Sequence, residues 1–142
     1  MSERPPLAVV LGLEPHPEGG WYRRTWTSPV EVTTADGRVR PTATSIYFLL
    51  PAGESSAWHQ VASDEVWVVH QGRVTLELGG GGDEPGQAEQ RVLGLDLSAG
   101  ELPQVVVPAG VWQRTSPSTS DALVTCLVSP GFDFADFQLA SG

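Results

Sequence analysis

The 142-residue chain carries 17 acidic side chains against 8 basic ones, and its formal net charge of −9 excludes a nucleic-acid-binding surface, because phosphate binding is driven by basic side chains. Its 16 glycines and 12 prolines are more than helices tolerate and predict an all-β class with many turns. No segment approaches the ~20 apolar residues of a membrane span, and no apolar signal segment follows the first residues, so we expect a cytoplasmic protein with no membrane partner.

The N-terminal segment predicts one helix, over residues 5–13, because proline suits a first helical turn and the apolar residues can cover one face. Residues 14–23 have neither a helical nor a strand period, and their proline and glycine content predicts a rigid loop that leads into the first strand. Within this loop His16 stands between two prolines, and we expect it to be a solvated surface residue.

Short strands with turn signals between them follow along the rest of the chain. They are predicted at residues 21–27, 45–50, 65–70, 74–78, 92–96, 104–107, 111–115 and 122–128. This close spacing fits a sandwich or a barrel. Cys126 lies in the apolar run of the last strand, where we expect it to be buried, and no second cysteine is present for an intramolecular disulfide.

The glycine-rich stretch 79–89 has the composition of a linker, but the strands on either side of it are too few to enclose a core alone. We therefore expect a long mobile loop inside one domain that spans residues 1–142. Near the C-terminus, residues 130–137 place aromatic side chains among acidic ones. This segment either forms a short turn of helix that caps the barrel end or simply anchors the tail through Phe132, Phe134 and Phe137.

The segment 53–72 contains the side chains that could take part in catalysis or bind a metal. Five residues separate Gly53 from His59, five separate His59 from Glu65, and six separate Glu65 from Gly72. Because side chains alternate along a strand, Glu65 should share one face with Trp67, whereas His70 takes the other face and is left out of the site.

This spacing resembles the first motif of the cupin superfamily. The resemblance implies that His59 and Glu65 point into a barrel, where the corresponding residues commonly ligate a metal. A second motif is recognisable in residues 100–113, with a Pro108-Ala109-Gly110 turn and with Gln113 where cupins often carry a further histidine. Val61 stands where the superfamily has its second histidine.

Longer strings resemble the DUF985 family, also called cupin 5, across nearly the whole chain. They are residues 13–23, 45–50, 58–59, 63–67, 103–113 and 130–137. The resemblance implies a double-stranded β-helix, or cupin jelly-roll barrel, similar in shape to the dTDP-sugar 3,5-epimerases, and it implies a homodimer. Two positions depart from the family pattern: Val68 replaces a frequent histidine, and Arg24 replaces an expected acidic residue.

The metal-binding hypothesis relies on His59, Glu65 and Gln113. A tight transition-metal site needs three or four nitrogen, sulfur or carboxylate ligands, with neutral histidine as the usual nitrogen donor. One imidazole, one carboxylate and one amide oxygen predict a poor site for a tightly bound metal, so no cofactor is assigned, and a divalent metal stays an alternative. The alternative is a metal-dependent, oxygenase-like cupin in which a divalent metal is completed by water or substrate.

Without a metal, His59 and Glu65 inside a partly apolar barrel could exchange protons with a small-molecule ligand. In this hypothesis His59 is the general base, Glu65 orients the imidazole or acts as the acid, and Tyr47 and Gln104 hold the oxygen that gains charge. The alternative without catalysis is that His59 and Glu65 pair with each other and so satisfy their buried polar groups.

Aromatic residues near the motifs predict an apolar ligand pocket. Trp67 is the preferred pocket residue and Trp58 a second candidate, whereas alternation points Trp112 away from Gln113, toward an outer layer or a dimer contact. From the loop 14–23, Glu18 and Tyr22 could border the pocket mouth or reach a partner subunit.

Three functions are compatible with these residues. The first is a metal-independent isomerase or epimerase acting on a small polar metabolite, sugar-like or a keto acid. The second is the metal-dependent cupin, and the third is a ligand-binding or sensing module without turnover. Whether the protein is an enzyme stays open at this point.

Overall fold

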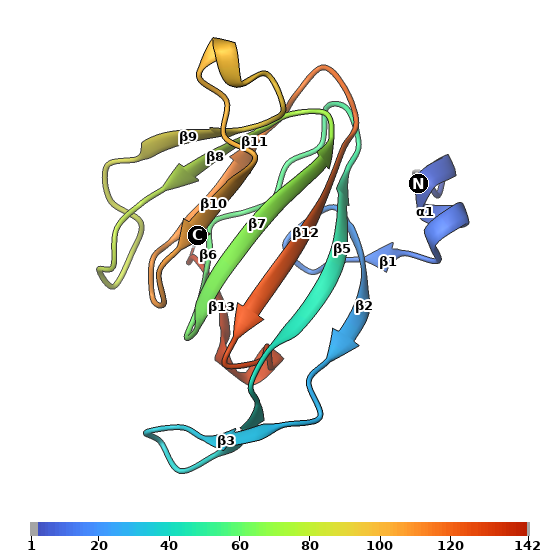
Figure 1. The fold of residues 1–142 in the computed structure, drawn as a ribbon. Coiled ribbons are helices and arrows are strands. Elements are labelled where there is room, and N and C mark those ends of the chain that lie inside the picture. The colour runs from blue at the N-terminus through green and yellow to red at the C-terminus, as the bar shows by residue number, and fades with distance from the viewer. Residues whose placement is uncertain (1–2, 142) are drawn as a thin grey trace.

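The computed structural model describes residues 3–141, which form two antiparallel sheets and a small hairpin. The first sheet has the order β1-β2-β5-β12-β7-β10, with β1 Glu14–Pro15, β2 Trp21–Thr27, β5 Thr44–Leu50, β12 Ala122–Ser129, β7 Asp64–Gln71 and β10 Gln104–Val107. The second has the order β13-β6-β11-β8-β9, with β13 Phe137–Leu139, β6 His59–Val61, β11 Gln113–Ser116, β8 Val74–Leu78 and β9 Glu89–Leu93. The arrangement is the predicted double-stranded β-helix (Figure 1).

The remaining elements lie around this barrel. They are the helix α1 Pro6–Leu11, the hairpin of β3 Glu31–Thr33 and β4 Val39–Pro41, and two 3-10 turns, η1 Leu97–Ala99 and η2 Phe134–Asp136. Figure 1 shows α1 outside the barrel beside β1, and the β3–β4 hairpin projecting from the end where η2 lies. Within residues 3–141 no helix is long and apolar enough to cross a membrane.

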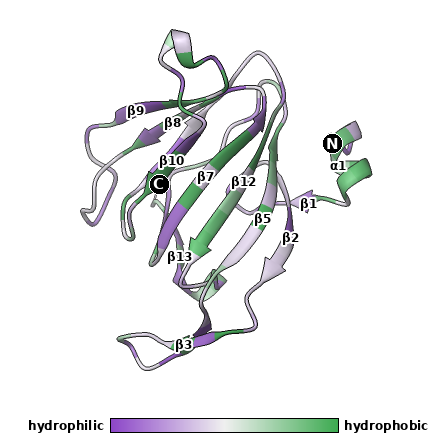
Figure 2. Ribbon diagram, in the orientation of Figure 1, coloured by the Kyte–Doolittle hydropathy of each residue, from purple (hydrophilic) through white to green (hydrophobic). Residues whose placement is uncertain are grey.

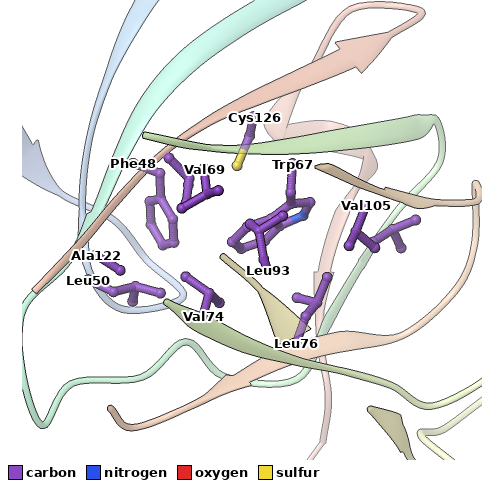
Figure 3. Packing of buried hydrophobic residues seen from close by; sticks show 12 residues of the cluster. Phe48, Leu50, Trp67, Val69, Val74, Leu76, Leu93, Val105, Ala122 and Cys126 are labelled. Carbon is purple, nitrogen blue, oxygen red and sulfur yellow. The ribbon is translucent and has the colours of Figure 1, made fainter. Parts of the chain in front are cut away.

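The core lies between the two sheets at the end of the barrel away from η2. Side chains at alternate positions of the long strands point inward, as the period of a strand requires. Figure 3 shows Phe48, Trp67 and Leu93 facing one another, all buried, and Cys126 confirms its predicted burial next to them. In Figure 2 the central strand β12 is mostly hydrophobic, whereas the edge strand β9 is mostly hydrophilic.

The outer face of the larger sheet has its own apolar cover. Ala8 and Leu13, in and after α1, pack against Trp21 of β2 and Leu49 of β5. The helix ends because Gly12 adopts a left-handed conformation with φ of 68°, a conformation that glycine adopts without strain. The outward-facing Leu49 of β5 is therefore covered by this helix and the residues that follow it.

All eight predicted strands exist, and the bounds of two of them and of the helix were misplaced. The strand predicted at 92–96 is β9, Glu89–Leu93, because its pairing with β8 runs from Glu89 opposite Leu78 to Leu93 opposite Val74. The strand predicted at 111–115 begins at Gln113, because the backbone of Trp112 bonds to Gly79 and Gly80 instead of to a strand. The predicted helix 5–13 is shorter, Pro6–Leu11.

Candidate functional site

A cavity of about 170 Å³ lies at the end of the barrel where η2 and β13 are found, and residues of both elements line it. The strand register explains its position. Val128 on β12 lies opposite Thr44 of β5 on one side and opposite Glu65 of β7 on the other, and these three side chains line the cavity. One step deeper, Cys126 lies between Ile46 and Trp67, so the buried Trp67 begins the core below.

Glu18 reaches this cavity from the tip of the β1–β2 hairpin. The tip is tight because the His16 amide donates to the Gly20 carbonyl, at 2.9 Å. Gly19 and Gly20 have φ of 109° and 80°, and a Cβ at Gly19 would collide with the carbonyl of Ser55. The backbone carbonyl of Glu18 accepts a hydrogen bond from the Ala57 amide at 2.7 Å, which fixes the tip against the chain that leads into β6. The hairpin thus holds a carboxylate over the barrel mouth.

His59, the first residue of β6, is buried beside Glu18. Its Nδ1 lies 2.8 Å from Oε2 of Glu18 and 2.8 Å from the carbonyl oxygen of Ala57. The ring N–H aligns with the Ala57 carbonyl, so the contact with Glu18 is an ion pair, and Glu18 Oε2 is buried without a hydrogen-bond donor among the described residues. Burial alone would lower the pKa of His59, but the Glu18 carboxylate outweighs burial and raises it to about 9.

His16 completes this cluster as an uncharged ring. Its Nδ1 accepts a hydrogen bond from the backbone amide of Glu18 at 3.1 Å. Burial lowers the pKa of His16 below its ordinary value of 6.5, against the attraction of Glu18. The prediction of a solvated surface residue was wrong: the His16 side chain is 5% exposed and lines the cavity, because the hairpin turn folds the loop inward.

Glu65 of β7 faces the same cavity, and its carboxylate accepts a hydrogen bond from the side-chain amide of Gln113. Gln113 Nε2 donates to Glu65 Oε1 at 2.7 Å, while Gln113 Oε1 accepts from the indole N–H of Trp67 at 3.0 Å. These two bonds fix which end of the amide faces the carboxylate. Burial raises the pKa of Glu65 to about 7, with the positive charge of His59 opposing the shift.

The C-terminal segment forms the aromatic wall of the cavity. Phe132, Phe134 and Phe137 contact one another edge to face, with ring centroids 4.8 to 6.2 Å apart. Tyr22 meets Phe134 in the same way, at 6.4 Å. Phe137 stacks on the His59 ring at 5.4 Å, so it covers one face of the imidazole. The segment includes one 3-10 turn, as one of the two sequence alternatives proposed.

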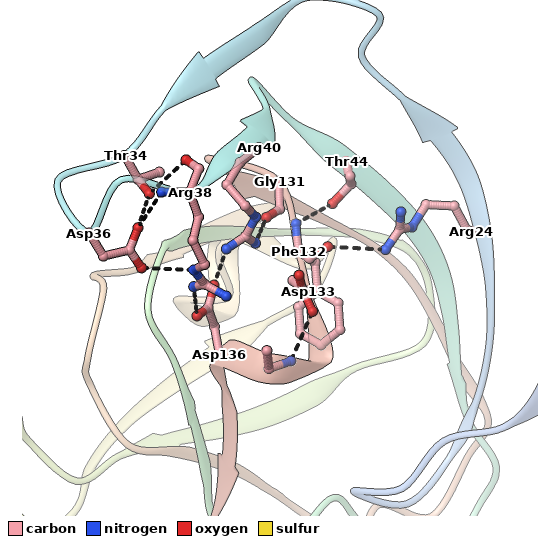
Figure 4. A network of polar contacts seen from close by, with 11 residues as sticks. Arg24, Thr34, Asp36, Arg38, Arg40, Thr44, Gly131, Phe132, Asp133 and Asp136 are labelled. Atoms are coloured by element: carbon pink, nitrogen blue, oxygen red, sulfur yellow. Dashed lines mark hydrogen bonds and ion pairs between the residues drawn. The ribbon is translucent and has the colours of Figure 1, made fainter.

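The aromatic wall is connected to the β3–β4 hairpin by ion pairs. Arg40 of β4 forms an ion pair with Asp136 and donates to the carbonyl of Gly131. Arg38 forms a second ion pair with Asp136 (Figure 4). Arg24, at the cavity rim, donates to the carbonyl of Phe132 at 3.4 Å. We call Arg38, Arg40 and Asp136 the tail clamp.

The structure brings four predicted site residues together and separates the rest. His59, Glu65, Glu18 and Tyr22 all line the cavity. Gln113 and Trp67 lie directly behind Glu65, buried and bonded to each other.

Three other predicted pocket residues lie elsewhere, and their assignment to this cavity is corrected. Tyr47 points to the outer face of β5, against the helix side, because its neighbours Ile46 and Phe48 point inward. Gln104 is exposed on β10. Trp58 packs against the guanidinium of Arg114 in a separate outer groove, with 4.5 Å from Arg Cζ to the ring centroid.

The residues of the cavity do not supply the set of metal ligands expected of a metal-binding cupin. Across residues 3–141 no group of three His, Cys, Asp or Glu side chains is placed to hold a metal ion. Gln113 turns its amide nitrogen toward Glu65 and uses its oxygen for Trp67, so it offers no free oxygen beside the carboxylate. Val61, which lines the cavity, supplies no ligand.

Comparison with known proteins identifies relatives over nearly the whole chain. The family described as the cupin superfamily (DUF985) matches residues 7–140. The uncharacterized protein YML079W of Saccharomyces cerevisiae is 29% identical over 143 residues, covering 89% of this chain and 70% of its own.

Two solved structures have closely similar folds. Protein SO0799 from Shewanella oneidensis is 38% identical, covers 99% of this chain and 86% of its own, and superposes with a TM-score of 0.84. A hypothetical protein from Leishmania major is 33% identical, covers 92% of this chain and 83% of its own, and has a TM-score of 0.83.

Proposed function

The chain belongs to the DUF985 family of the cupin superfamily, and from this premise we propose that its barrel cavity is the site of a metal-independent isomerase or epimerase that moves a proton within a small polar metabolite. The observation that carries the proposal is the pair of groups in the cavity. The pKa of Glu65 is about 7 and that of His59 is about 9, so near pH 8 one is ready to accept a proton and the other to donate one.

The geometry favours a division of labour opposite to the one expected from the sequence. His59 cannot be the resting base near neutral pH, because Glu18 keeps its ring protonated. Its Nδ1–H is engaged by the Ala57 carbonyl, so Nε2–H is the ring proton left to donate, and His59 lines the cavity. Glu65 is therefore the general base, and Glu18, not Glu65, orients the imidazole.

The reaction proposed for these groups balances without a co-reactant. The Glu65 carboxylate removes a proton from the carbon next to a carbonyl, and the electron pair of the broken C–H bond forms a C=C bond. The carbonyl oxygen gains charge and takes the proton of His59 Nε2. Return of a proton to carbon, and of the hydroxyl proton to His59, gives an isomer or epimer. The aromatic wall keeps bulk water from the intermediate.

The test is solvent-deuterium incorporation into a library of small hydroxy-carbonyl compounds in D2O, followed by NMR and mass spectrometry. Glu65→Gln should lower the exchange rate by about 100-fold or more. His70→Gln, which changes an exposed histidine on the opposite face of the same strand, should leave it unchanged. Exchange that survives in Glu65→Gln, or a wild-type protein that exchanges no compound, would contradict the proposal.

The pH profile of the exchange rate gives a second readout. The base must be ionised, so the rate should rise with pH through about 7. The acid must be protonated, so the rate should fall as pH passes about 9. A rate that is flat between these values and declines on both sides is expected. A wild-type protein that binds compounds without exchange would instead be a ligand-binding module.

A further inference from the structure

The volume of the cavity limits the size of the ligand that it can hold. At about 170 Å³ it is close to the volume of an engineered protein cavity, about 150 Å³, that holds one benzene molecule. A single six-membered ring with one or two small substituents fills such a space. A nucleotide or a peptide does not fit inside it. Phe134, Phe137 and Tyr22 line the cavity, and aromatic side chains pack favourably against a ring.

One buried atom in this cavity has an ion-pair partner, the imidazolium of His59, but no aligned hydrogen-bond donor. Glu18 Oε2 has no hydrogen-bond donor in the part of the chain that the structure describes, although the Glu18 side chain is only 8% exposed. His16 cannot supply the donor, because its Nδ1 already accepts from the Glu18 amide. A buried acceptor without a donor is costly, so a ligand that brings an O–H or N–H group gains affinity here.

The charges around this atom disfavour an ionised ligand. The carboxylate of Glu18 is balanced by the imidazolium of His59 at 2.8 Å, and His16 is uncharged. A carboxylate or phosphate ligand would therefore enter a space with no spare positive charge beyond Arg24, which is exposed at the rim. An ammonium group at Glu18 would lie next to His59 and be repelled by it.

We propose that the cavity selects an uncharged single-ring molecule whose hydroxyl group donates a hydrogen bond to Oε2 of Glu18. The inference rests on the proposed function, because it places the ligand in the same cavity as Glu65 and His59. It adds that the substrate is a neutral ring compound held by a hydroxyl group, and that Glu18 determines this specificity as well as the charge of His59.

The experiment uses four ring compounds of matched size at pH 6.5: phenol, toluene, benzoate and benzylammonium. Binding to the full chain is followed by protein-observed NMR titration. Phenol should bind with a millimolar Kd and shift signals of residues around the cavity, about tenfold more tightly than each of the other three. Equal or tighter binding of toluene, benzoate or benzylammonium overturns the inference, and so does the absence of saturable phenol binding.

Variants at Glu18 locate the hydrogen bond. Glu18→Gln keeps the shape of the side chain and replaces the charged acceptor by a neutral one, so phenol affinity should fall about tenfold while toluene affinity stays the same. Glu14→Gln, an exposed glutamate on the same hairpin, is the matched control and should change neither. Unchanged phenol affinity in Glu18→Gln overturns the role of Glu18.

Repeating the titration in Glu65→Gln separates the two proposals. This variant lacks the proposed base but keeps Glu18, so the preference for phenol should persist. If phenol is preferred but no compound exchanges deuterium, the ligand class stands and the catalytic proposal fails. If compounds exchange deuterium but phenol is not preferred, catalysis stands and the ligand class fails.

Discussion

The charge on His59 depends chiefly on Glu18, with the Ala57 carbonyl and Glu65 also favouring the protonated ring. A fully buried imidazole would lose its proton readily, because burial disfavours the charged form. Glu18 reverses this through an oxygen 2.8 Å from Nδ1. The imidazolium in turn opposes the rise of the Glu65 pKa. The residues of the cavity therefore act as one coupled charge system.

The first prediction concerns that coupling. In Glu18→Gln the attraction that offsets burial is lost, so the pKa of His59 should fall from about 9 to its ordinary value of 6.5 or lower. An NMR pH titration of the His59 ring carbon Cε1 measures this. Glu14→Gln should leave the pKa of His59 in place. A His59 pKa that remains near 9 without Glu18 would show that another group holds the charge.

The second prediction concerns the amide behind Glu65. Gln113→Leu removes the N–H that stabilises the ionised carboxylate, so the pKa of Glu65 should rise above about 7. An NMR titration of the Glu65 carboxyl carbon reports this value, and so does the pH profile of deuterium exchange in the proposed reaction. The exposed Gln104→Leu is the matched control and should have no effect. An unchanged or lower Glu65 pKa in Gln113→Leu would contradict the role of this hydrogen bond.

At the scale of single residues, the sequence predicts what depends on local spacing. Alternation along one strand places Glu65 and Trp67 on the same face, and the structure buries both. That this face points into the barrel was implied by the family resemblance. His59 could be placed in the barrel only through the family resemblance. His16 was misplaced, and the aromatic wall was seen only as a cap or a tail anchor, because both depend on contacts between ends of the chain more than 100 residues apart. No local period carries that information.

At the scale of elements, the same contrast separates long strands from short ones. Strands β5, β7 and β12 have seven or eight residues, and burial alternates along β7 and β12, so their sequences indicate them clearly. Strands β3, β4, β6 and β13 have three residues each and were missed. Three residues are too few to show an alternating pattern. These strands form because neighbouring strands of the same sheet pair with their backbone hydrogen-bonding groups.

The third prediction concerns the tail clamp. Asp136→Asn leaves the buried guanidinium of Arg40 with the Gly131 carbonyl but without its carboxylate, an uncompensated charge that should cost about 3 kcal/mol of unfolding free energy. Because the clamp holds the segment that carries Phe132, Phe134 and Phe137, hydrogen exchange of amides 131–139 should accelerate and phenol affinity should fall. Urea denaturation and exchange mass spectrometry measure both effects.

The control for the clamp is a surface pair. Glu89 and Arg91 form an ion pair in which the glutamate side chain is 71% exposed, so Glu89→Gln should cost less than about 1 kcal/mol and leave the tail amides unchanged. If Asp136→Asn is as mild as this surface variant, the clamp does not stabilise the cavity wall. If it destabilises the fold without faster exchange at 131–139, the clamp serves the hairpin rather than the tail.

At the scale of the whole molecule, the barrel is filled at one end and open at the other. The same inward-facing rows of β5, β12 and β7 carry large apolar side chains in the core and smaller or polar ones, Thr44, Val128 and Glu65, at the open end. This gradient leaves space that the C-terminal aromatics wall off. It also makes stability depend on pH, because the open end contains buried ionisable groups.

The last prediction is that the unfolding free energy falls as pH rises from 6.5 to 9. His59 has a folded pKa of about 9, above its unfolded value of 6.5, so its contribution is complete below pH 6.5 and is lost as pH approaches 9. Glu65, protonated in the folded state up to about pH 7, adds to the fall at the lower end of this window. His16 has a lowered pKa and gives the opposite slope, but only below pH 6.5, and Cys126, with a raised pKa, acts only from about pH 9 upward.

The loss of unfolding free energy attributable to His59 is on the order of 3 kcal/mol. Urea denaturation across this window should show it, with less than half of the fall remaining in Glu18→Gln and the full fall in Glu14→Gln; stability that is constant or rises with pH would contradict the charge assignment at His59.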